Sequence, residues 1–465
     1  MRTRGMWLCV FVLVFPVSAS RAEEVAPRRI TLEQAIQRAL VSNPSLSASR
    51  ETLAASGYRV GEARAGYLPQ ASVTAGYKRA TSNSASPPYI SSSAASSSAA
   101  GTSIQKIIAR DSMSSYDNWN AGLTLTQTLY DFGKTGGAFD AAKASERASR
   151  ADLAASVETL YLTVTQAFFT VLATQEAVSA ADETKRQMEK HLDIARAQVA
   201  AGVRPKIDIT RAESDLAAAN LASMKAKNAN QIARVTLNNA MGTEENIDYA
   251  VERPARGEAL PVPDTETAVK EALSTRPDYR SLKEKIQASE GALKTARSGY
   301  FPSFGANGGL NYVGYKIPDM AYNWTVGVTL SWNAFSGLYT MNAVREAEAN
   351  IRVLEATVRS MELAIRSEIE SAILAYREAV ERLTPSKALL QSARETLGLA
   401  EGRYSAGVGN LIEVTDAQAV YTQGQTGLIQ AEYDLEVARV LLLKALGKMP
   451  ITTVPTATAV GSTAK

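Results

Sequence analysis

The stretch WTVGVTLSW, residues 324–332, alternates strictly between two kinds of side chain. As a β-strand it would point successive side chains to opposite faces of a sheet. One face would carry Trp324, Val326, Val328, Leu330 and Trp332, and the other Thr325, Gly327, Thr329 and Ser331. A half-buried strand of a soluble sheet has the same alternation. Aromatic residues at both ends, with none between them, favour a strand that crosses a bilayer and places these rings at its two interfaces.

Three further stretches are predicted as strands of the same kind. The four strands are expected over about 67–79, 117–131, 301–315 and 322–335. These lengths suit a tilted strand that crosses a bilayer. Aromatic side chains gather at both ends of the strands, and we predict a membrane girdle at Tyr77, Trp119, Trp324, Trp332, Tyr130 and Phe301.

The number of strands has a consequence for assembly. Four strands cannot close a barrel, and an open sheet edge is not stable in hydrocarbon. The chain is therefore expected to contribute its strands to an oligomer. Two copies would give eight strands with an interior filled by side chains, so a homotrimer with twelve strands is the smallest assembly that leaves a lumen. The Thr, Ser and Gly faces would line it.

The sequence also contains an internal repeat, which predicts a duplication. RAGYLP (64–69) matches RSGYFP (297–302) at an offset of 233 residues, whereas AGLTLTQ (121–127) matches VGVTLSW (326–332) at an offset of 205. The offset changes across a Ser/Ala-rich segment, 84–103, which we interpret as a mobile exposed loop of the first copy. The repeats are assigned to residues 23–253 and 254–449, and each would contain short helix, helix, strand, loop, strand, very long helix, turn and helix.

Long helices are predicted over about 134–200, 208–241, 339–405 and 412–446. Counting in 4–3 steps from Leu153 and from Val358, twelve of fourteen positions in each copy are apolar or aromatic. This sustained 3.5-residue period indicates left-handed supercoiling of neighbouring helices. Pro385 is expected to kink the second copy or to start a new segment there. A secreted structural coiled-coil or filament protein, with the strands in a soluble domain, is the alternative interpretation.

The two ends of the chain carry their own signals. Residues 1–22, with basic Arg2 and Arg4 before a short apolar core, are typical of a secretory signal peptide. Cys9 lies inside that core, so cleavage would leave no thiol in the mature chain. Cleavage would also remove three arginines and no acid, leaving 47 basic and 47 acidic residues, a balance that does not favour nucleic acid. Residues 450–465 are expected to form a disordered tail.

The sequence shows no motif for catalysis, for a cofactor or for a metal. It lacks the HExxH, P-loop and Gly-rich dinucleotide patterns. His191 is the single histidine of the chain and is expected on the surface of a long helix. We therefore expect neither an enzyme nor a cofactor-binding protein.

The ordered set of these features resembles the TolC-like outer membrane efflux proteins. The resemblance rests on the duplicated unit, on the GYLP and GYFP entries to the strands, and on two matching turns, AGVRPKIDI (201–209) and AGVGNLIEV (406–414). It implies a trimeric twelve-stranded barrel in the outer membrane of a Gram-negative bacterium, continued into the periplasm by a helical coiled-coil barrel. Such a conduit would be the exit duct of a tripartite efflux pump or type I secretion system, with a periplasmic adaptor protein and an inner-membrane transporter as partners.

The resemblance also implies which residues act at the periplasmic end. The tips Ala201, Gly202, Val203, Ala406, Gly407 and Val408 would contact the adaptor, and Tyr404, Glu413, Asp416 and Asp208 would form the gate. The i, i+3 spacing of Glu413 and Asp416 places both on one helix face. Taken alone, these acids would be interpreted as solvated residues at a helix start, where the dipole favours them, and only the resemblance favours the gate. Gly409 departs from the family, which often has an arginine there; Arg204 and Lys206 could partly substitute.

Overall fold

The computed structural model describes residues 28–81, 115–243, 249–254 and 260–450. These residues form two compact units, which divide after Ala39, Thr163 and Gly257. Each unit is considered by itself, although helix α3 (Lys134–Ala200) passes from the second into the first. The predicted signal peptide, the Ser/Ala-rich loop and all of the predicted C-terminal tail except Pro450 lie outside the described residues.

The first unit is built on an antiparallel helical hairpin. Its helices are the later part of α3 and α4 (Ile207–Met241), and near their tip Leu192 and Ala195 pack against Ala212. Short strands β1 (Arg28–Ile30) and β4 (Tyr249–Val251) pair in parallel beside helix α1 (Leu32–Ser42), which begins in this unit. Further from the tip the Asn230 side chain donates to the Thr174 hydroxyl at 3.0 Å. Apolar packing and a buried amide therefore both fix the pairing of the two helices.

His191 corrects one expectation in this hairpin. It is buried, with 9% of its surface exposed, and does not lie on the helix surface. It precedes the core residue Leu192 by one position, and Asp215 on α4 is among the charged groups near it. Its place is set by the partner helix, which the sequence period of α3 alone does not specify.

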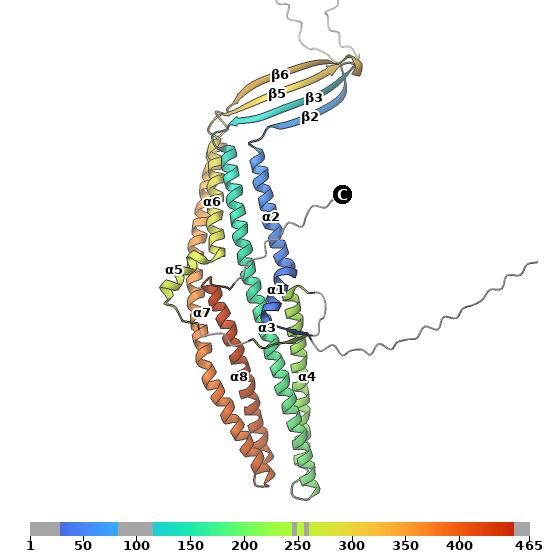
Figure 1. Ribbon diagram of the computed structural model, residues 1–465, viewed down its shortest axis with the longest axis vertical. Helices are drawn as coiled ribbons and strands as arrows, with labels where there is room; N and C mark the ends of the chain where they lie inside the picture. The colour runs from blue at the N-terminus through green and yellow to red at the C-terminus, as the bar shows by residue number, and fades with distance from the viewer. Residues whose placement is uncertain (1–27, 82–114, 244–248, 255–259, 451–465) are drawn as a thin grey trace, which may run out of the picture. The chain divides into compact units, whose positions relative to one another are not determined.

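The second unit contains five further helices, α2 (Pro44–Ala65), α5 (Thr265–Thr275), α6 (Pro277–Ser298), α7 (Tyr339–Ser405) and α8 (Leu411–Ala445), among its described residues (Figure 1). The side chain of Asn43 caps α2 by accepting from the backbone N–H of Ser45 at 2.9 Å. Helices α7 and α8 pack along one another, and Ile365, Ile369 and Leu442 are fully buried in their core. The long coiled-coil pattern therefore buries its apolar positions against an antiparallel partner.

Pro385 does not start a new helical segment, because α7 continues through it. Proline removes one backbone donor from the helix at this point. In the same turn the Ser386 hydroxyl donates to the carbonyl of Arg382 at 2.8 Å. A side-chain hydrogen bond thus supplements the turn in which the backbone hydrogen bond is missing.

The second unit also contains a four-stranded antiparallel sheet in the described part of the chain, in the order β2-β3-β5-β6. Its strands are β2 (Gln70–Thr81), β3 (Ser115–Tyr130), β5 (Ser303–Gly314) and β6 (Ala321–Ser331), with a short 3-10 helix, η3 (Ile317–Asp319), before β6. The strands join α2, α3, α6 and α7 at one end of the sheet (Figure 1). Strands β2 and β6 are its edges.

Two strands begin later than their aromatic residues suggest. The backbone N–H of Tyr67 donates to Arg64 O and that of Phe301 donates to Ser298 O, each at 3.0 Å. The last helical turns of α2 and α6 therefore extend to these aromatics. The strands begin only after the prolines that follow, at Gln70 and Ser303.

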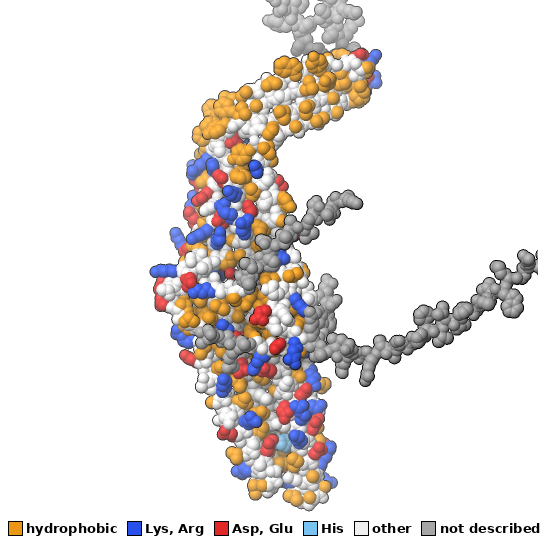
Figure 2. All heavy atoms as spheres, in the orientation of Figure 1, with side chains coloured by type: hydrophobic (Ala, Val, Ile, Leu, Met, Phe, Trp, Pro, Cys, Tyr) orange, Lys and Arg blue, Asp and Glu red, His pale blue; other side chains and the backbone are white. Residues whose placement is uncertain are grey.

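The register aligns the alternating faces of all four strands. Val73 pairs with Leu123, Leu123 with Leu310, and Leu310 with Trp324, so one face is apolar from edge to edge. The next row pairs Ser72 with Thr124 and Gly309 with Thr325 on the polar face. Val73 and Val326 on the apolar face are about 80% exposed (80% and 79%). Figure 2 shows hydrophobic side chains over this sheet, whereas charged side chains are interspersed on the helices.

The two halves of the chain have the same order of elements and matching helix lengths. Helices α1 and α5 each have 11 residues, α2 and α6 have 22, α3 and α7 have 67, and α4 and α8 have 35. Strands β2 and β5 each have 12 residues. Within the described residues, no helix combines the length and apolar character that a membrane span requires.

Candidate functional site

The two long hairpins end in the same turn, which explains why the AGV sequence occurs twice. In the second tip, Gly407 adopts φ 79°, its N–H donates to Tyr404 O, and the N–H of Val408 donates to Arg403 O, both at 3.1 Å. In the first tip, Gly202 adopts φ 76° and makes the equivalent pair of bonds with Val203. This is a Schellman motif, in which glycine takes the left-handed position that a side chain would strain.

The tips present their small residues to solvent. All six predicted contact residues are exposed, and Val203 and Val408 expose 65% and 74% of their surface. The turns differ after the valine. Asn410 caps α8 by accepting from the N–H of Ile412, whereas Lys206 precedes α4 without a side-chain cap. Only the second tip therefore has a side-chain hydrogen bond from its N-cap residue to the first turn of the following helix.

Gly409 is the tightest point of the second tip. Its N–H donates to Arg403 O at 2.8 Å. A Cβ placed on it would lie 2.8 Å from the backbone nitrogen of Tyr404, closer than real Cβ contacts. The loop therefore approaches the last turn of α7 so closely that position 409 has no room for a side chain. An arginine at 409 would therefore not fit this turn unless the loop shifted.

The four predicted gate residues lie in different environments. Tyr404 is 1% exposed and packs with Leu397, Leu411 and Val414 inside the second hairpin. Glu413 and Asp416 are exposed on the first turns of α8. Asp208, the acid of the first tip, is buried, with 8% of its surface exposed.

An ion pair across the second tip was not predicted from the sequence. The Nε of Arg403, at the end of α7, lies 3.5 Å from Oε2 of Glu413, and the side chains are 59% and 48% exposed. Asp416 has no ion pair among the described residues. The i, i+3 spacing relates Glu413 to Asp416, but the sequence contains no signal for a pair that closes across a turn.

The aromatic residues of the sheet form two levels. The helix-side level comprises Tyr130, Phe132, Phe301 and Trp332, and its rings touch: Tyr130 and Phe132 have centroids 4.7 Å apart, and Phe132 and Phe301 5.0 Å apart. The far level comprises Tyr77, Trp119, Tyr312, Tyr322 and Trp324, in which the rings of Tyr77 and Trp119 are 4.6 Å apart. Trp324 and Trp332 are eight residues apart, or about 26 Å along an extended strand.

A bulge brings Tyr130 into the helix-side level. The pairing of β3 with β5 shifts between Thr128 and Tyr130, so Tyr130 pairs with Phe304. Phe304 pairs with Leu330, which lies on the apolar face. Simple alternation would have placed Tyr130 on the polar face with Thr128. The extra residue of the bulge, Leu129, reverses the direction of Tyr130.

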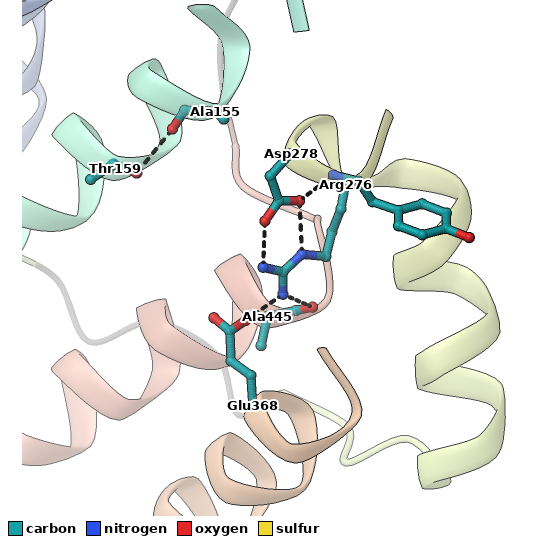
Figure 3. A network of polar contacts seen from close by, with 7 residues as sticks. Ala155, Thr159, Arg276, Asp278, Glu368 and Ala445 are labelled. Atoms are coloured by element: carbon teal, nitrogen blue, oxygen red, sulfur yellow. Dashed lines mark hydrogen bonds and ion pairs between the residues drawn. The ribbon is translucent and has the colours of Figure 1, made fainter. Parts of the chain in front are cut away.

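A buried polar network in the second unit was also missed. The guanidinium of Arg276 points toward Asp278, Glu368 and the carbonyl of Ala445 (Figure 3). The Arg276 side chain is 7% exposed, and its Nη2 lies 2.7 Å from Asp278 Oδ2, whereas its Nη1 lies 2.6 Å from Glu368 Oε2 and 3.4 Å from Ala445 O. One guanidinium therefore joins the start of α6 to α7 and to the end of α8. The matching position in the first half is Asn43, a helix cap. The sequence signal that could have revealed this network is the difference between the two repeats at this position, where the first has Asn43 and the second has Arg276.

Two carboxyl groups near Arg276 have opposite pKa shifts. Burial by itself raises the pKa of Asp278, but hydrogen bonds from Arg276 outweigh it and hold that pKa below its ordinary value. Burial and the nearby Asp278 carboxylate raise the pKa of Glu158, on α3, to about 7. Within the described residues, no group of three or more His, Cys, Asp or Glu side chains is arranged as metal ligands.

Comparison with known proteins adds independent evidence. A family model described as outer membrane efflux protein matches residues 35–243 and 268–448. The probable outer membrane lipoprotein SilC of Salmonella typhimurium is 26% identical over 347 residues, which cover 71% of this chain and 72% of SilC. The outer membrane protein TolC of Salmonella enteritidis is 23% identical over 431 residues, covering 90% of this chain and 82% of TolC.

A solved structure shares the fold. The CmeC outer membrane channel of Campylobacter jejuni superposes with a TM-score of 0.79, at 18% identity, covering 90% of this chain and 85% of CmeC. At this identity the likeness concerns the fold, in which a sheet of strands continues into long helical hairpins.

Proposed function

The chain belongs to the outer membrane efflux protein family, and from this premise we propose that it forms a homotrimeric exit duct of a tripartite efflux pump. It is a protein of the outer membrane of a Gram-negative bacterium, and an efflux function is favoured over the secreted filament alternative. Relatives named for export, such as the pyoverdine export protein OpmQ and the toluene efflux protein TtgC, support the pump assignment.

The observation that carries the proposal is the four-stranded sheet of the described chain. One face is apolar and exposed, aromatic levels mark both ends of that face, and β2 and β6 are edges. Open edges are unstable in hydrocarbon, and closure requires further copies. In our proposal three chains supply twelve strands, whose Thr, Ser, Gly and Asn faces line the lumen, and the girdle residues contact outer-membrane lipid.

We also propose that the chain arose by duplication, with repeats at 23–253 and 254–449. The recurrence of helix lengths from 11 to 67 residues in the same order supports this view. Cleavage of residues 1–22 and a loose tail at 450–465 remain predictions, and of these segments the structure describes only Pro450.

In the proposed duct the hairpin tips form the periplasmic end. The exposed Ala-Gly-Val turns would contact the hairpin of a periplasmic adaptor, which connects the duct to an inner-membrane transporter that supplies energy. Glu413 and Asp416 would lie near the axis in three copies, where crowded carboxylates attract cations. Tyr404 would act indirectly, because it packs inside its own hairpin. The duct itself performs no chemistry in this proposal and needs no cofactor.

The first experiment measures the mass of detergent-extracted protein from separated inner and outer membranes. A species of three chains in the outer-membrane fraction, with ion conductance in a planar bilayer, is the expected result. A soluble or filamentous species would overturn the proposal. Trp324→Ser with Trp332→Ser removes one ring from each aromatic level and should reduce the outer-membrane yield, whereas Tyr58→Ser, at an aromatic on α2 that is even more exposed, should not.

A further inference from the structure

Glycines recur on the polar face of the sheet, and several of them pair with a residue whose polar side chain reaches over them. These pairs are Gly76 with Asn120, Gly122 with Asn311, Gly309 with Thr325 and Gly327 with Asn307. A glycine has no Cβ, so a neighbouring group can approach its backbone closely. At these pairs the opposite side chain therefore has room to lie over the glycine and need not project away from the sheet.

Asn311 shows how such a side chain lies. Its Oδ1 occupies the space that a Cβ of Gly122 would need on β3, and its Nδ2 lies 4.0 Å from a Cβ built on Gly309 of its own strand, β5. The amide therefore extends over glycines of two neighbouring strands. Thr74 covers Gly122 from β2, with its Oγ1 3.3 Å from the same built Cβ. Gly122 is buried as a result, although Asn311 itself is exposed.

Asn120 and Asn307 are directed toward a neighbouring strand in the same way. The Oδ1 of Asn120 lies 2.8 Å from a Cβ built on Gly76. The Oδ1 of Asn307 lies 3.7 Å from a Cβ built on Gly327, and the Thr329 hydroxyl donates to this oxygen at 2.9 Å. This hydrogen bond comes from the neighbouring strand β6, so it holds the amide of Asn307 against the sheet.

The polar face is also uncharged over most of its length. In the described sheet, no charged side chain lies on this face between the row that pairs Gln70 with Thr126 and the row that pairs Gly76 with Asn120. The next residue of β2 on this face is Lys78. Amides and hydroxyls have dipoles but no net charge, so this surface does not attract cations or anions over a distance. Width is therefore the property by which it can restrict a solute.

We propose that Asn120, Asn307 and Asn311 lie flat in the space left by the glycines opposite, and that this packing sets the free width of the duct between its two aromatic levels. The inference rests on the proposed function, because it places the polar face in the lumen of a trimer. The glycines are positioning residues: they act on passing solutes through the asparagine that each one accommodates. An amide displaced from one glycine would recur in every chain around the axis and narrow the lumen at that level.

The test measures which neutral polymers enter this part of the duct. Trimers of the full chain are reconstituted in planar bilayers, and polyethylene glycols of increasing mass are added only on the side of the far aromatic level. A polymer that enters lowers the conductance, so the largest polymer with an effect gives the size limit. We expect Gly122→Ala to shift this limit to smaller polymers, because the new methyl group displaces the Asn311 amide toward the lumen.

A double-mutant cycle separates the amide from the methyl group. Asn311→Ala should keep the size limit close to that of the wild type, because a flat amide takes up little of the lumen. Gly122→Ala combined with Asn311→Ala should give the same limit, since no amide remains to be displaced. A clear shift to larger polymers in Asn311→Ala alone would show that the amide already projects into the lumen, and would overturn the proposal. An unchanged limit in Gly122→Ala trimers would also overturn it.

Two other glycines of β5 serve as matched controls. Gly308→Ala adds a methyl group on the apolar face, where the nearest atom to the built Cβ is Thr325 O at 3.8 Å. Gly305→Ala adds one on the polar face, where the nearest atom is Gln127 O at 3.6 Å. Neither methyl group displaces an amide, so both variants should keep the wild-type size limit. A shift in Gly305→Ala as large as that in Gly122→Ala would assign the effect to the methyl group and contradict the proposal.

Misfolding and failure of the proposed function would look different. Misfolding of a variant is recognised from its trimer yield, and if Gly122→Ala does not assemble, Gly76→Ala, which displaces Asn120 beside the edge strand β2, must lower the size limit instead. If the proposed function is wrong, the wild-type chain itself gives no trimer or no conductance. If the wild-type trimer conducts but no polymer lowers its conductance, this section does not restrict passage, and the inference alone is wrong.

Discussion

The ring of Phe132 stacks on the ring of Phe301, with centroids 5.0 Å apart and planes inclined by 12°. Phe132 follows β3 of the first half, and Phe301 precedes β5 of the second half. Phe132 adopts φ 51°, a left-handed conformation that is costly for a residue with a side chain. The stacking therefore joins the two halves of the chain at the helix-side aromatic level, and offsets backbone strain at the point where a strand becomes a helix.

This relationship predicts an order among variants of Phe132. Phe132→Ala loses the stacking but keeps the strained conformation, and should destabilise the folded protein by about 1–3 kcal/mol. Phe132→Gly also loses the ring but adopts φ 51° without strain, so it should be less destabilising than Phe132→Ala. Thermal unfolding of the detergent-solubilised protein measures both. Equal loss in the two variants would show that backbone strain at 132 has no influence.

A second prediction concerns the close approach at Gly409. Gly409→Ala would place a methyl group 2.8 Å from the nitrogen of Tyr404, so the loop must shift, at a cost of about 1–3 kcal/mol. Gly402→Ala, on α7 with nothing within 4 Å, should instead stabilise by up to about 1 kcal/mol, because alanine favours the helix. Thermal unfolding followed by circular dichroism compares the two. A harmless Gly409→Ala would contradict the packing described for this turn.

The Arg276 network should be important for stability. Arg276→Gln leaves the carboxylates of Asp278 and Glu368 without their buried partner, and we expect a loss of about 3 kcal/mol. Lys285→Gln breaks an exposed pair with Asp152 and should cost less than about 1 kcal/mol. Denaturant unfolding of the two variants, side by side, checks the difference. Similar losses would mean that burial of Arg276 adds nothing to its ion pairs.

Glu158 predicts a dependence of stability on pH. Its pKa is about 7 in the folded chain against an ordinary 4.5, so the folded chain holds this proton more tightly. Between pH 4.5 and 7 the free energy of unfolding should therefore fall as pH rises, by about 1–2 kcal/mol after allowance for partial exposure. Below 4.5 and above 7 this group should contribute no slope.

Substitution isolates that contribution. Glu158→Gln should remove the fall between pH 4.5 and 7 and raise stability at pH 8, whereas Glu51→Gln, on the exposed face of α2, should leave the pH profile as it is. Melting temperatures of the detergent-solubilised protein from pH 4 to pH 8 give the profiles. A profile that keeps its slope in Glu158→Gln would assign the pH dependence to other groups.

Much of the fold follows from periodicity in the sequence. The period-2 stretch at 324–332 lies in β6 as far as Ser331, and the 3.5-residue spacing from Leu153 runs through α3. The turns at the two hairpin tips could also be predicted, because glycine in an Ala-Gly-Val turn can take the left-handed position at the end of a helix. These features depend on neighbours along the chain, and local sequence is sufficient to encode them.

The predicted gate residues show where such reasoning stops. Sequence spacing places Glu413 and Asp416 on one helix face, yet it does not place Arg403 beside Glu413 or Tyr404 inside the hairpin core. These positions depend on how closely the loop at Gly409 approaches α7. That distance is set by packing across the turn and has no period in the sequence.

The sequence by itself determined the alternating strands, the long paired helices, the repeated order of elements and the turns at the hairpin tips, because each depends on residues a few positions apart. Only the tertiary structure decided that a bulge at Leu129 turns Tyr130 to the apolar face, that His191 is buried, and that Arg276 joins three helices. These outcomes require segments far apart in the chain to meet at defined distances. Burial, ion pairing and ring stacking between such segments arise only when the folded chain brings them into contact.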